Sequence, residues 1–336
     1  MGAEHGRNRS EIEPTAGRRT LLLFIVTSLT FGTAFVGIKA GLVDIPPILF
    51  AGLRYDIGAA VLLAYVYWRG GYWRPRTRGD LIAIAVAGFF LSGLNAVLLF
   101  SGQQYLTTGT AAVIFSLVPV LAPLFALVLL PDERIDIVGM VGILLGFVGV
   151  AIIVGIQSLS TSGDSTVLGV ALVGGAAVAA AFGSVLLSRT DRSIPGLGMT
   201  TWALVLAAGL VHAISVLMGE SPMDVTPTRS ALVAVFWVGI PATAIAFPAY
   251  YGLIDRAGPV RANLISYTVP LVATGVGAVV LGEIIPIRTV YGFLVIVVGF
   301  ALVERHNLRD EIRRFRGLPV PPEQDDEHLC ESAPRG

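Results

Sequence analysis

Ten separate stretches of this 336-residue chain are apolar over the length needed to cross a lipid bilayer. A tilted spanning helix needs roughly 17–25 mostly apolar residues, and the runs are continuous rather than alternating, which favours helices over barrel strands. Only 14% of the residues are charged, against about a quarter in an ordinary globular domain, so lipid must be much of the solvent. The sequence therefore predicts an all-α membrane protein whose spans are 21–38, 48–68, 81–101, 109–130, 137–156, 167–187, 199–218, 231–254, 260–281 and 287–303.

Charge balance and motifs argue against other classes of protein. Acidic and basic residues are equal in number, whereas a nucleic-acid partner would require a basic face. The one cysteine, Cys330, allows neither an intrachain disulfide nor a cysteine zinc cluster. The chain contains no GxxxxGK[ST] phosphate loop, HExxH or GxSxG motif. We therefore expect no enzymatic activity, no cofactor, no metal site and no nucleic-acid partner.

The distribution of basic residues predicts the orientation, because positively charged connections stay in the cytoplasm. With the N-terminus inside, the outer connections hold only Lys39, Arg229 and Arg288, and Arg54 lies within a span. All other arginines fall in inner segments. We expect a multi-pass protein of the plasma membrane with both termini cytoplasmic, a tail at 1–20, an extracytoplasmic linker at 157–166 and a charged, largely disordered tail at 305–336.

The two halves of the chain repeat each other, at 21–156 and 167–304. One offset of 151 residues, which becomes 150 after Pro131, holds from the first span of each half to its fifth. The matching residues are Phe31-Gly32-Thr33 with Phe182-Gly183-Ser184, Pro119 with Pro270, Glu133 with Glu283, Gly142 with Gly292, and Gly149 with Gly299. Because five spans is an odd number, the second half enters the membrane from the opposite side. The sequence thus predicts two inverted five-helix repeats.

Several of these stretches resemble a known family. The segments "LVPVLAPLFALVLLPDE" and "TVPLVATGVGAVVLGE", the Gly-rich spans that follow them, and "PPILFAGLRYDIGAAVLL" with its arginine look like the EamA-type branch of the drug/metabolite transporter superfamily. The resemblance implies a secondary active transporter that works by alternating access and often exports amino acids, other small metabolites or drugs. It also implies a central cavity bordered by the first, third, fourth, sixth, eighth and ninth spans. A passive facilitator or channel for small solutes is the alternative.

Polar, aromatic and proline residues of the cavity-bordering spans are the candidates for contact with a small-molecule substrate. Amides and hydroxyls suit polar or zwitterionic cargo, aromatic rings supply the apolar wall of most ligand pockets, and paired prolines often mark a transport site. Core packing and simple kinks are the alternatives for each. The candidates are Thr33, Asn95, Phe115, Pro119, Phe182, Ser184, Phe247, Tyr250, Asn263, Ser266, Tyr267 and Pro270.

Charged residues suggest coupling or gating. Arg54 and Asp56 project about 200° apart on one helix. In one interpretation Arg54 contacts an anionic substrate and Asp56 couples protons. In the interpretation that we favour, both lie near the outer interface, and Arg54 snorkels or forms an ion pair. His212 is either a proton relay or a hydrogen-bonded core residue. Glu133 and Glu283 cap helix ends or hold loop arginines, with gating as the other interpretation. The coupling ion, H+ or Na+, and the formation of a homodimer stay open.

A stripe of glycines indicates close helix packing, because helices in lipid approach closely only through small side chains. Gly142, Gly146 and Gly149 share one face of the fifth span, and we expect them to serve static packing.

Overall fold

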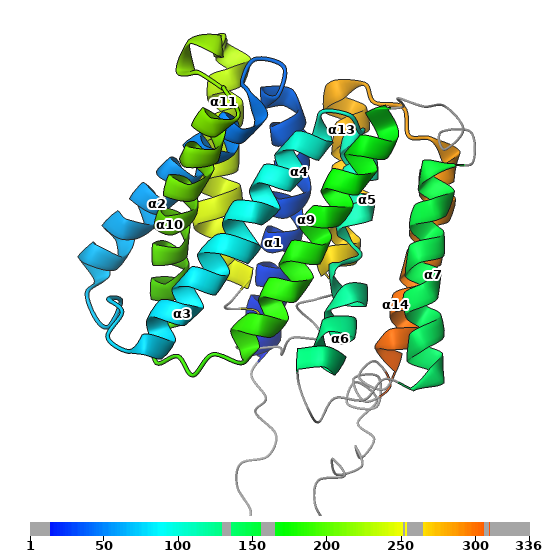
Figure 1. The fold of residues 1–336 in the computed structure, drawn as a ribbon, viewed down its shortest axis with the longest axis horizontal. Coiled ribbons are helices and arrows are strands. Elements are labelled where there is room, and N and C mark those ends of the chain that lie inside the picture. Colours follow the sequence, from blue (N-terminus) through cyan, green and yellow to red (C-terminus); the bar gives the residue numbers. More distant parts are fainter. Residues whose placement is uncertain are drawn as a thin grey trace, which may run out of the picture. The chain divides into compact units, whose positions relative to one another are not determined.

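The computed structural model describes residues 14–129, 136–155, 165–250, 253, 265–305 and 309. The chain divides into two compact units, Met1–Val303 and Glu304–Gly336, and the helices below belong to the first. Every regular element in the described ranges is a helix (Figure 1). This confirms the predicted all-α membrane fold.

Eight helices are long and apolar enough to cross a membrane, and Ile265–Leu281 and Ile287–Val303 are two shorter apolar helices. Together they correspond to the ten predicted spans. In the first half the elements are α1 (Pro14–Gly41), α2 (Pro47–Arg69), α3 (Arg78–Val86), η1 (Ala87–Leu94), α4 (Asn95–Gln103), α5 (Thr108–Phe115), α6 (Val118–Leu129) and α7 (Ile137–Val154). In the second half they are α9 (Ser165–Ser188), α10 (Gly196–Leu217), η2 (Pro222–Asp224), α11 (Arg229–Gly239), η3 (Ile240–Ile245), α13 (Ile265–Leu281) and α14 (Ile287–Val303).

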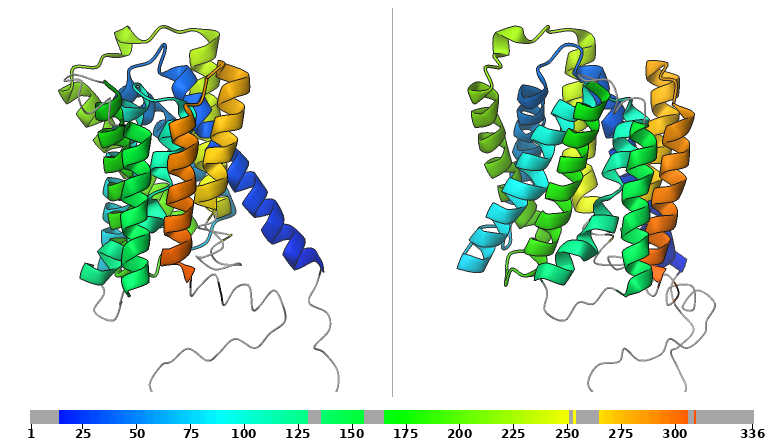
Figure 2. Two further views of the ribbon diagram at one scale, coloured as in Figure 1. Left: turned by 90° about the vertical axis from the view of Figure 1, so that its right-hand side faces the viewer. Right: turned by 45° about the vertical axis from the view of Figure 1, so that its right-hand side comes forward.

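The packing of the helices follows the duplication. The first span, α1, packs on the ninth, α13, and correspondingly the sixth span, α9, packs on the fourth, α5 and α6. The third span packs on the sixth through α4 and α9, and correspondingly the eighth packs on the first through α11 and α1. α2 pairs with α10, α5 with α13, and α7 with α14. If each helix is replaced by its counterpart in the other half, the same set of contacts results, as two inverted repeats require. The N-terminal part of α1 diverges from its neighbours (Figure 2), and its leucines Leu21 and Leu22 are exposed.

Equivalent positions of the third and eighth spans carry a π-helical segment, which the sequence had not led us to expect. With the 151-residue offset, η1 (Ala87–Leu94) corresponds to residues 238–245, which include η3 (Ile240–Ile245). In η3 the Ala246 N–H donates to the Pro241 carbonyl, five residues back. Thr243 Oγ1 donates to the Val238 carbonyl at 2.7 Å, so its hydroxyl satisfies a backbone acceptor just before the π-helical segment. Such segments frequently occur at functional sites.

The matched prolines of the fourth and ninth spans behave differently. The fourth span is broken at Ser116 and Leu117, and Pro119 is the second residue of α6, where its missing N–H costs no helix bond. α13 instead continues through Pro270. Pro119 therefore marks a break between two helices, whereas Pro270 lies within one.

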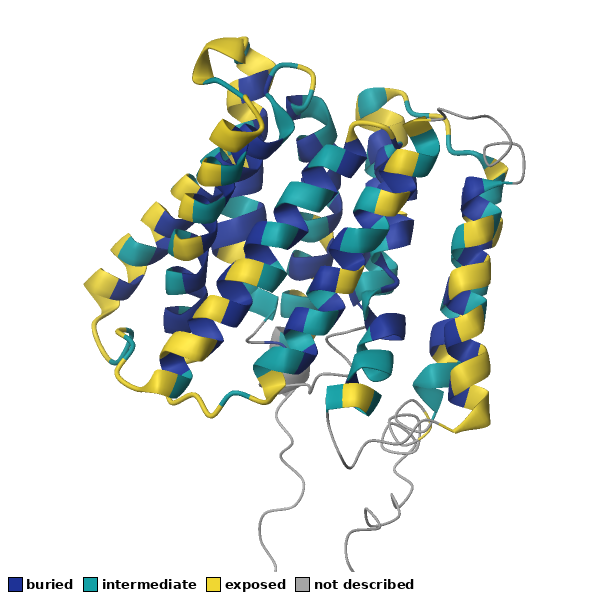
Figure 3. Ribbon diagram, in the orientation of Figure 1, coloured by how far each residue is buried: buried dark blue, intermediate teal, exposed yellow. Residues whose placement is uncertain are grey.

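Glycines bring α7 and α14 together at backbone distance. A Cβ atom built on Gly142 would lie 2.5 Å from the Gly299 carbonyl oxygen, and one on Gly292 would lie 2.6 Å from the Gly149 carbonyl oxygen. Both helices expose their opposite faces (Figure 3). The static packing role expected for the glycines of the fifth span agrees with this seam.

Candidate functional site

Two sets of hydrogen bonds lie at one end of the bundle, one between α1 and α4 and one at the start of α5. Lys39 at the end of α1 donates through Nζ to the carbonyls of Gln103 at 3.0 Å and Gln104 at 3.1 Å. These are final carbonyls of α4, where a cation is favoured by the helix dipole. Gln103 is fully buried and donates through its side-chain amide to the Phe35 carbonyl of α1.

Glu283, in the connection between α13 and α14, forms the second set. Its Oε2 accepts a hydrogen bond from the Thr108 backbone N–H at 2.8 Å, at the start of α5, and its charge attracts Lys39. The sequence led us to expect that Glu283 caps a helix end. The helix that it caps is α5, which lies in the other half of the chain. We call Lys39, Gln103, Gln104, Thr108 and Glu283 the Lys39–Glu283 latch.

Arg54 corrects one prediction. Its side chain does not snorkel, because the residue is only 8% exposed. Its guanidinium lies over the rings of Tyr55 at 4.4 Å and Phe100 at 4.6 Å, and the described residues give it no carboxylate partner. It donates to the Tyr55 hydroxyl, which in turn donates to the Ser92 carbonyl in η1. Tyr55, to which Arg54 donates, thus connects the second span to the π-helical segment of the third.

The side chains of Asp56 and His212 form a hydrogen bond that joins α2 to α10. Asp56 Oδ2 lies 2.8 Å from His212 Nε2, and the two side chains are 48% and 35% exposed. Gly52 leaves room for the imidazole, because a Cβ atom there would lie 2.6 Å from His212 Cε1. Arg54 turns to the opposite side of α2, as helix geometry predicts for residues two apart. The structure therefore brings together two candidates that the sequence treated separately.

The remaining polar candidates have local partners. Asn95 is buried and donates to the Ala176 carbonyl of α9 at 3.0 Å, so its amide joins the third span to the sixth. The hydroxyls of Thr33 and Ser184 donate to carbonyls of their own helices, at Leu29 and Ala181. None of these contacts tests a role in binding cargo.

The aromatic candidates take part in several ring contacts. Phe247 and Tyr250 surround Phe31 of α1, with ring centroids 5.6 Å and 6.2 Å from it. Phe182 of α9 packs between Phe90 and Phe125. Separately, Phe115 contacts Phe35, and the Tyr267 ring lies 4.4 Å from that of Phe300. Since Phe31 and Phe182 are repeat counterparts, the first two groups are equivalent places in the two halves.

The remaining candidates differ in burial. Pro119 and Pro270 are buried, and Ser266 is partly buried in the first turn of α13. Asn263 and Glu133 lie outside the described residues.

Two carboxylates that hold connections in place were missed from the sequence. Glu220 accepts hydrogen bonds from the Ile48 and Leu49 backbone N–H groups at the start of α2. Asp80 forms a capping box with Thr77 at the start of α3. The Thr-x-x-Asp spacing is a sequence signal for such a cap, whereas the long-range contact of Glu220 has no local signal.

Comparison with known proteins places these features in a family. The EamA-like transporter family matches residues 18–155 and again 167–305. An uncharacterized transporter of Archaeoglobus fulgidus is 28% identical over 84% of this chain and 98% of its own length. The uncharacterized inner membrane transporter YedA of Escherichia coli K12 is 29% identical over 76% of this chain and 82% of its own length. A solved crystal structure shares the fold with a TM-score of 0.61 and 24% identity, over 86% of this chain and 98% of that one.

Proposed function

This chain belongs to the EamA-like transporter family, and from that premise we propose that it is a secondary active transporter that exports small metabolites or drugs by alternating access. Membrane transport follows from the family and its relatives. The observation that carries the finer proposal is the exchange symmetry of the helix contacts. We propose that the latch holds one end of the bundle closed in this arrangement. Each of two inverted halves can adopt the conformation of the other. When the two halves exchange conformations, the open end of the bundle becomes closed and the opposite end opens.

The latch has a strength suited to a reversible gate. Its four hydrogen bonds contribute about 0.5–1.5 kcal/mol each, or about 2–6 kcal/mol in total. A two-state protein with a gap of a few kcal/mol keeps its minor state measurably populated, and a ligand then shifts the balance. The counterpart of Lys39 in the second half is Thr190, so the repeat-equivalent position carries no cation.

For orientation, we place the Lys39–Glu283 latch on the outer face of the plasma membrane. The described connections at the opposite end, 70–77 and 189–195, carry arginines, and positively charged connections stay in the cytoplasm. α1 begins and α14 ends at that same end (Figure 2), so both termini are cytoplasmic in this proposal.

For cargo and coupling, the buried amides and hydroxyls support polar or zwitterionic solutes. The Asp56–His212 pair is our candidate for proton coupling, because ionisable residues within spans commonly serve proton relays. Na+ remains the other candidate ion.

The test begins with a thermal-shift screen of the purified protein against amino acids, nucleosides, sugars and cationic drugs, since a ligand raises stability by mass action. A compound that stabilises the protein is then used in counterflow with proteoliposomes. Uptake of labelled compound stimulated by unlabelled compound inside is expected of a carrier. Flux without such stimulation would instead establish the channel alternative.

The gate is tested with Glu283→Gln, which weakens the cap of α5 and the attraction to Lys39. Glu220→Gln is the matched control, because Glu220 also caps a helix start but lies outside the latch. In protein that carries Cys330→Ser, we expect faster labelling of a cysteine placed at Thr107 in Glu283→Gln than in the control. Equal labelling would refute the gate.

A further inference from the structure

A buried carboxylate with no part in the proposed transport cycle joins two connections at the end opposite the latch. Asp80 at the start of α3 is fully buried. Its oxygens accept hydrogen bonds from two connections, which precede α3 and α10. The donors are Tyr72 Oη at 2.6 Å, Arg76 N at 3.0 Å, Thr77 N at 3.1 Å, Ser193 N at 2.8 Å, Ile194 N at 2.8 Å and Ser193 Oγ at 3.2 Å.

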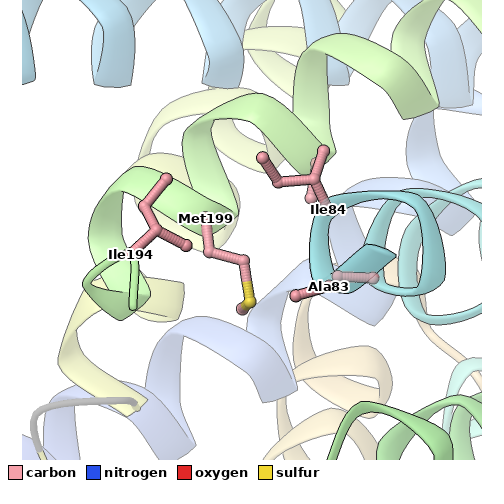
Figure 4. Packing of buried hydrophobic residues seen from close by; sticks show 6 residues of the cluster. Ala83, Ile84, Ile194 and Met199 are labelled. Carbon is pink, nitrogen blue, oxygen red and sulfur yellow. The ribbon is translucent and has the colours of Figure 1, made fainter. Parts of the chain in front are cut away.

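Packing below Asp80 holds the same two connections. Ile194 and Met199 face Ala83 and Ile84 of α3 (Figure 4). Nearby, the Trp73 and Trp202 rings stack with their centroids 6.0 Å apart, and Trp202 donates to the Trp73 carbonyl. The two connections therefore form one fixed surface rather than two independent loops.

This surface carries a concentration of positive charge. We define the arginine platform as the exposed residues Arg69, Arg74, Arg76, Arg78, Arg189 and Arg192. In the described part of the chain, none of them forms an ion pair with a carboxylate. Asp191 is the exposed carboxylate among them.

Aromatic rings orient part of the platform. The Arg74 guanidinium lies 5.0 Å from the Trp73 ring, and that of Arg76 lies 4.5 Å from the Tyr72 ring. A guanidinium stacked on a ring keeps its N–H groups free at its edge, where they match the geometry of a phosphate. The stacking thus prepares the arginines to bind an anion.

The neighbouring surface identifies the environment of the platform. Tyr67 and Trp68 at the end of α2 are 77% and 83% exposed, and such residues lie at the headgroup level of a membrane. Leu81 and Ile82, directly after the platform in α3, are also exposed. An anion bound here would have apolar surface beside it, as the headgroup of a phospholipid requires.

We propose that the arginine platform is a binding site for the phosphate of an anionic phospholipid. Charge complementarity and the adjoining apolar side chains favour a lipid over free phosphate. The site depends on Asp80 as a positioning residue, because its hydrogen bonds hold the two connections together. The proposal does not rest on the identity of the cargo or on the transport cycle.

The test titrates the purified full-length protein in neutral detergent with phosphatidylglycerol, phosphatidylcholine or inorganic phosphate and follows the melting temperature. Phosphatidylglycerol is expected to stabilise the protein more strongly than phosphatidylcholine, and salt should weaken the effect. Removing one arginine is expected to weaken the apparent lipid affinity roughly fivefold, and the variant Arg74→Gln/Arg76→Gln about 25-fold.

Arg229→Gln is the matched control, because Arg229 is the repeat counterpart of Arg78, is exposed, and lies at the other end of the bundle. It should bind phosphatidylglycerol as the wild type does. Equal stabilisation by both lipids, equal losses in Arg229→Gln and Arg74→Gln/Arg76→Gln, or full replacement of the lipid by inorganic phosphate would each overturn the proposal. Asp80→Asn should weaken lipid binding while all six arginines remain. If that variant does not fold, the exposed arginine variants still decide the outcome.

Discussion

The seam between α7 and α14 gives a prediction whose size follows from the structure. In Gly142→Ala the new Cβ would lie 2.5 Å from the Gly299 carbonyl oxygen and 2.8 Å from Val303 Cγ2. Ordinary contact begins at 3.4 Å, so the two backbones must separate locally by about 0.9 Å, the difference between 3.4 and 2.5 Å. Overpacking of this kind costs about 1–3 kcal/mol.

Gly209→Ala is the matched control for this variant. Gly209 is also within a long helix, α10, and a Cβ atom there would meet nothing within 4 Å. Both variants gain the same backbone term, about 0.4–1 kcal/mol for Gly to Ala at an unstrained position. The difference between them therefore isolates the clash with α14.

Thermal unfolding in detergent is the assay. At about 2–4 °C per kcal/mol, Gly142→Ala should melt about 2–12 °C below Gly209→Ala. Gly149→Ala should behave similarly, because its Cβ would lie 2.7 Å from the Gly292 carbonyl oxygen. The double variant Gly142→Ala/Gly149→Ala should lose less stability than the two single variants lose together, since one separation of the helices relieves both clashes. If Gly142→Ala melted with Gly209→Ala or above it, the close contact of α7 and α14 would be refuted.

Two further variants probe contacts between spans. Asn95→Ala removes the hydrogen bond to the Ala176 carbonyl and should lower the free energy of unfolding by about 0.5–1.5 kcal/mol. Thr33→Val loses only a bond within its own helix and should lower it less. Equal losses would mean that the Asn95 bond contributes nothing between helices. A double-mutant cycle of Asp56→Asn and His212→Gln should give a coupling energy of about 0.5–1 kcal/mol, and additive effects would show that the pair does not form.

Local patterns in the sequence predicted the number and type of the elements. Bilayer thickness fixes the length of an apolar helix, so all ten spans were found with small errors at their ends. The glycine stripe of the fifth span also predicted close packing, but the structure identified α14 as its partner. The π-helical segments were missed, because a single additional residue in a helical turn leaves the apolar run unchanged.

Contacts between charged groups were harder to predict. Arg54 was expected to snorkel or to form an ion pair, yet its guanidinium lies over the rings of Tyr55 and Phe100. Its environment depends on how α2 is rotated and which helix covers it, and neither is encoded in the composition of the span itself. The same holds for the Asp80 contacts, whose donors come from two connections.

The sequence by itself determined that this protein crosses the membrane as a duplicated, inverted set of helices, because hydrophobic length and repeat register are properties of continuous stretches of chain. Tertiary structure alone decided that Asp56 meets His212 and that Glu283 caps α5, since these pairs are separated by 156 and 175 residues. Such meetings depend on the rotation and neighbours of whole helices, and in lipid small differences in close packing, rather than the burial of apolar surface, select among them.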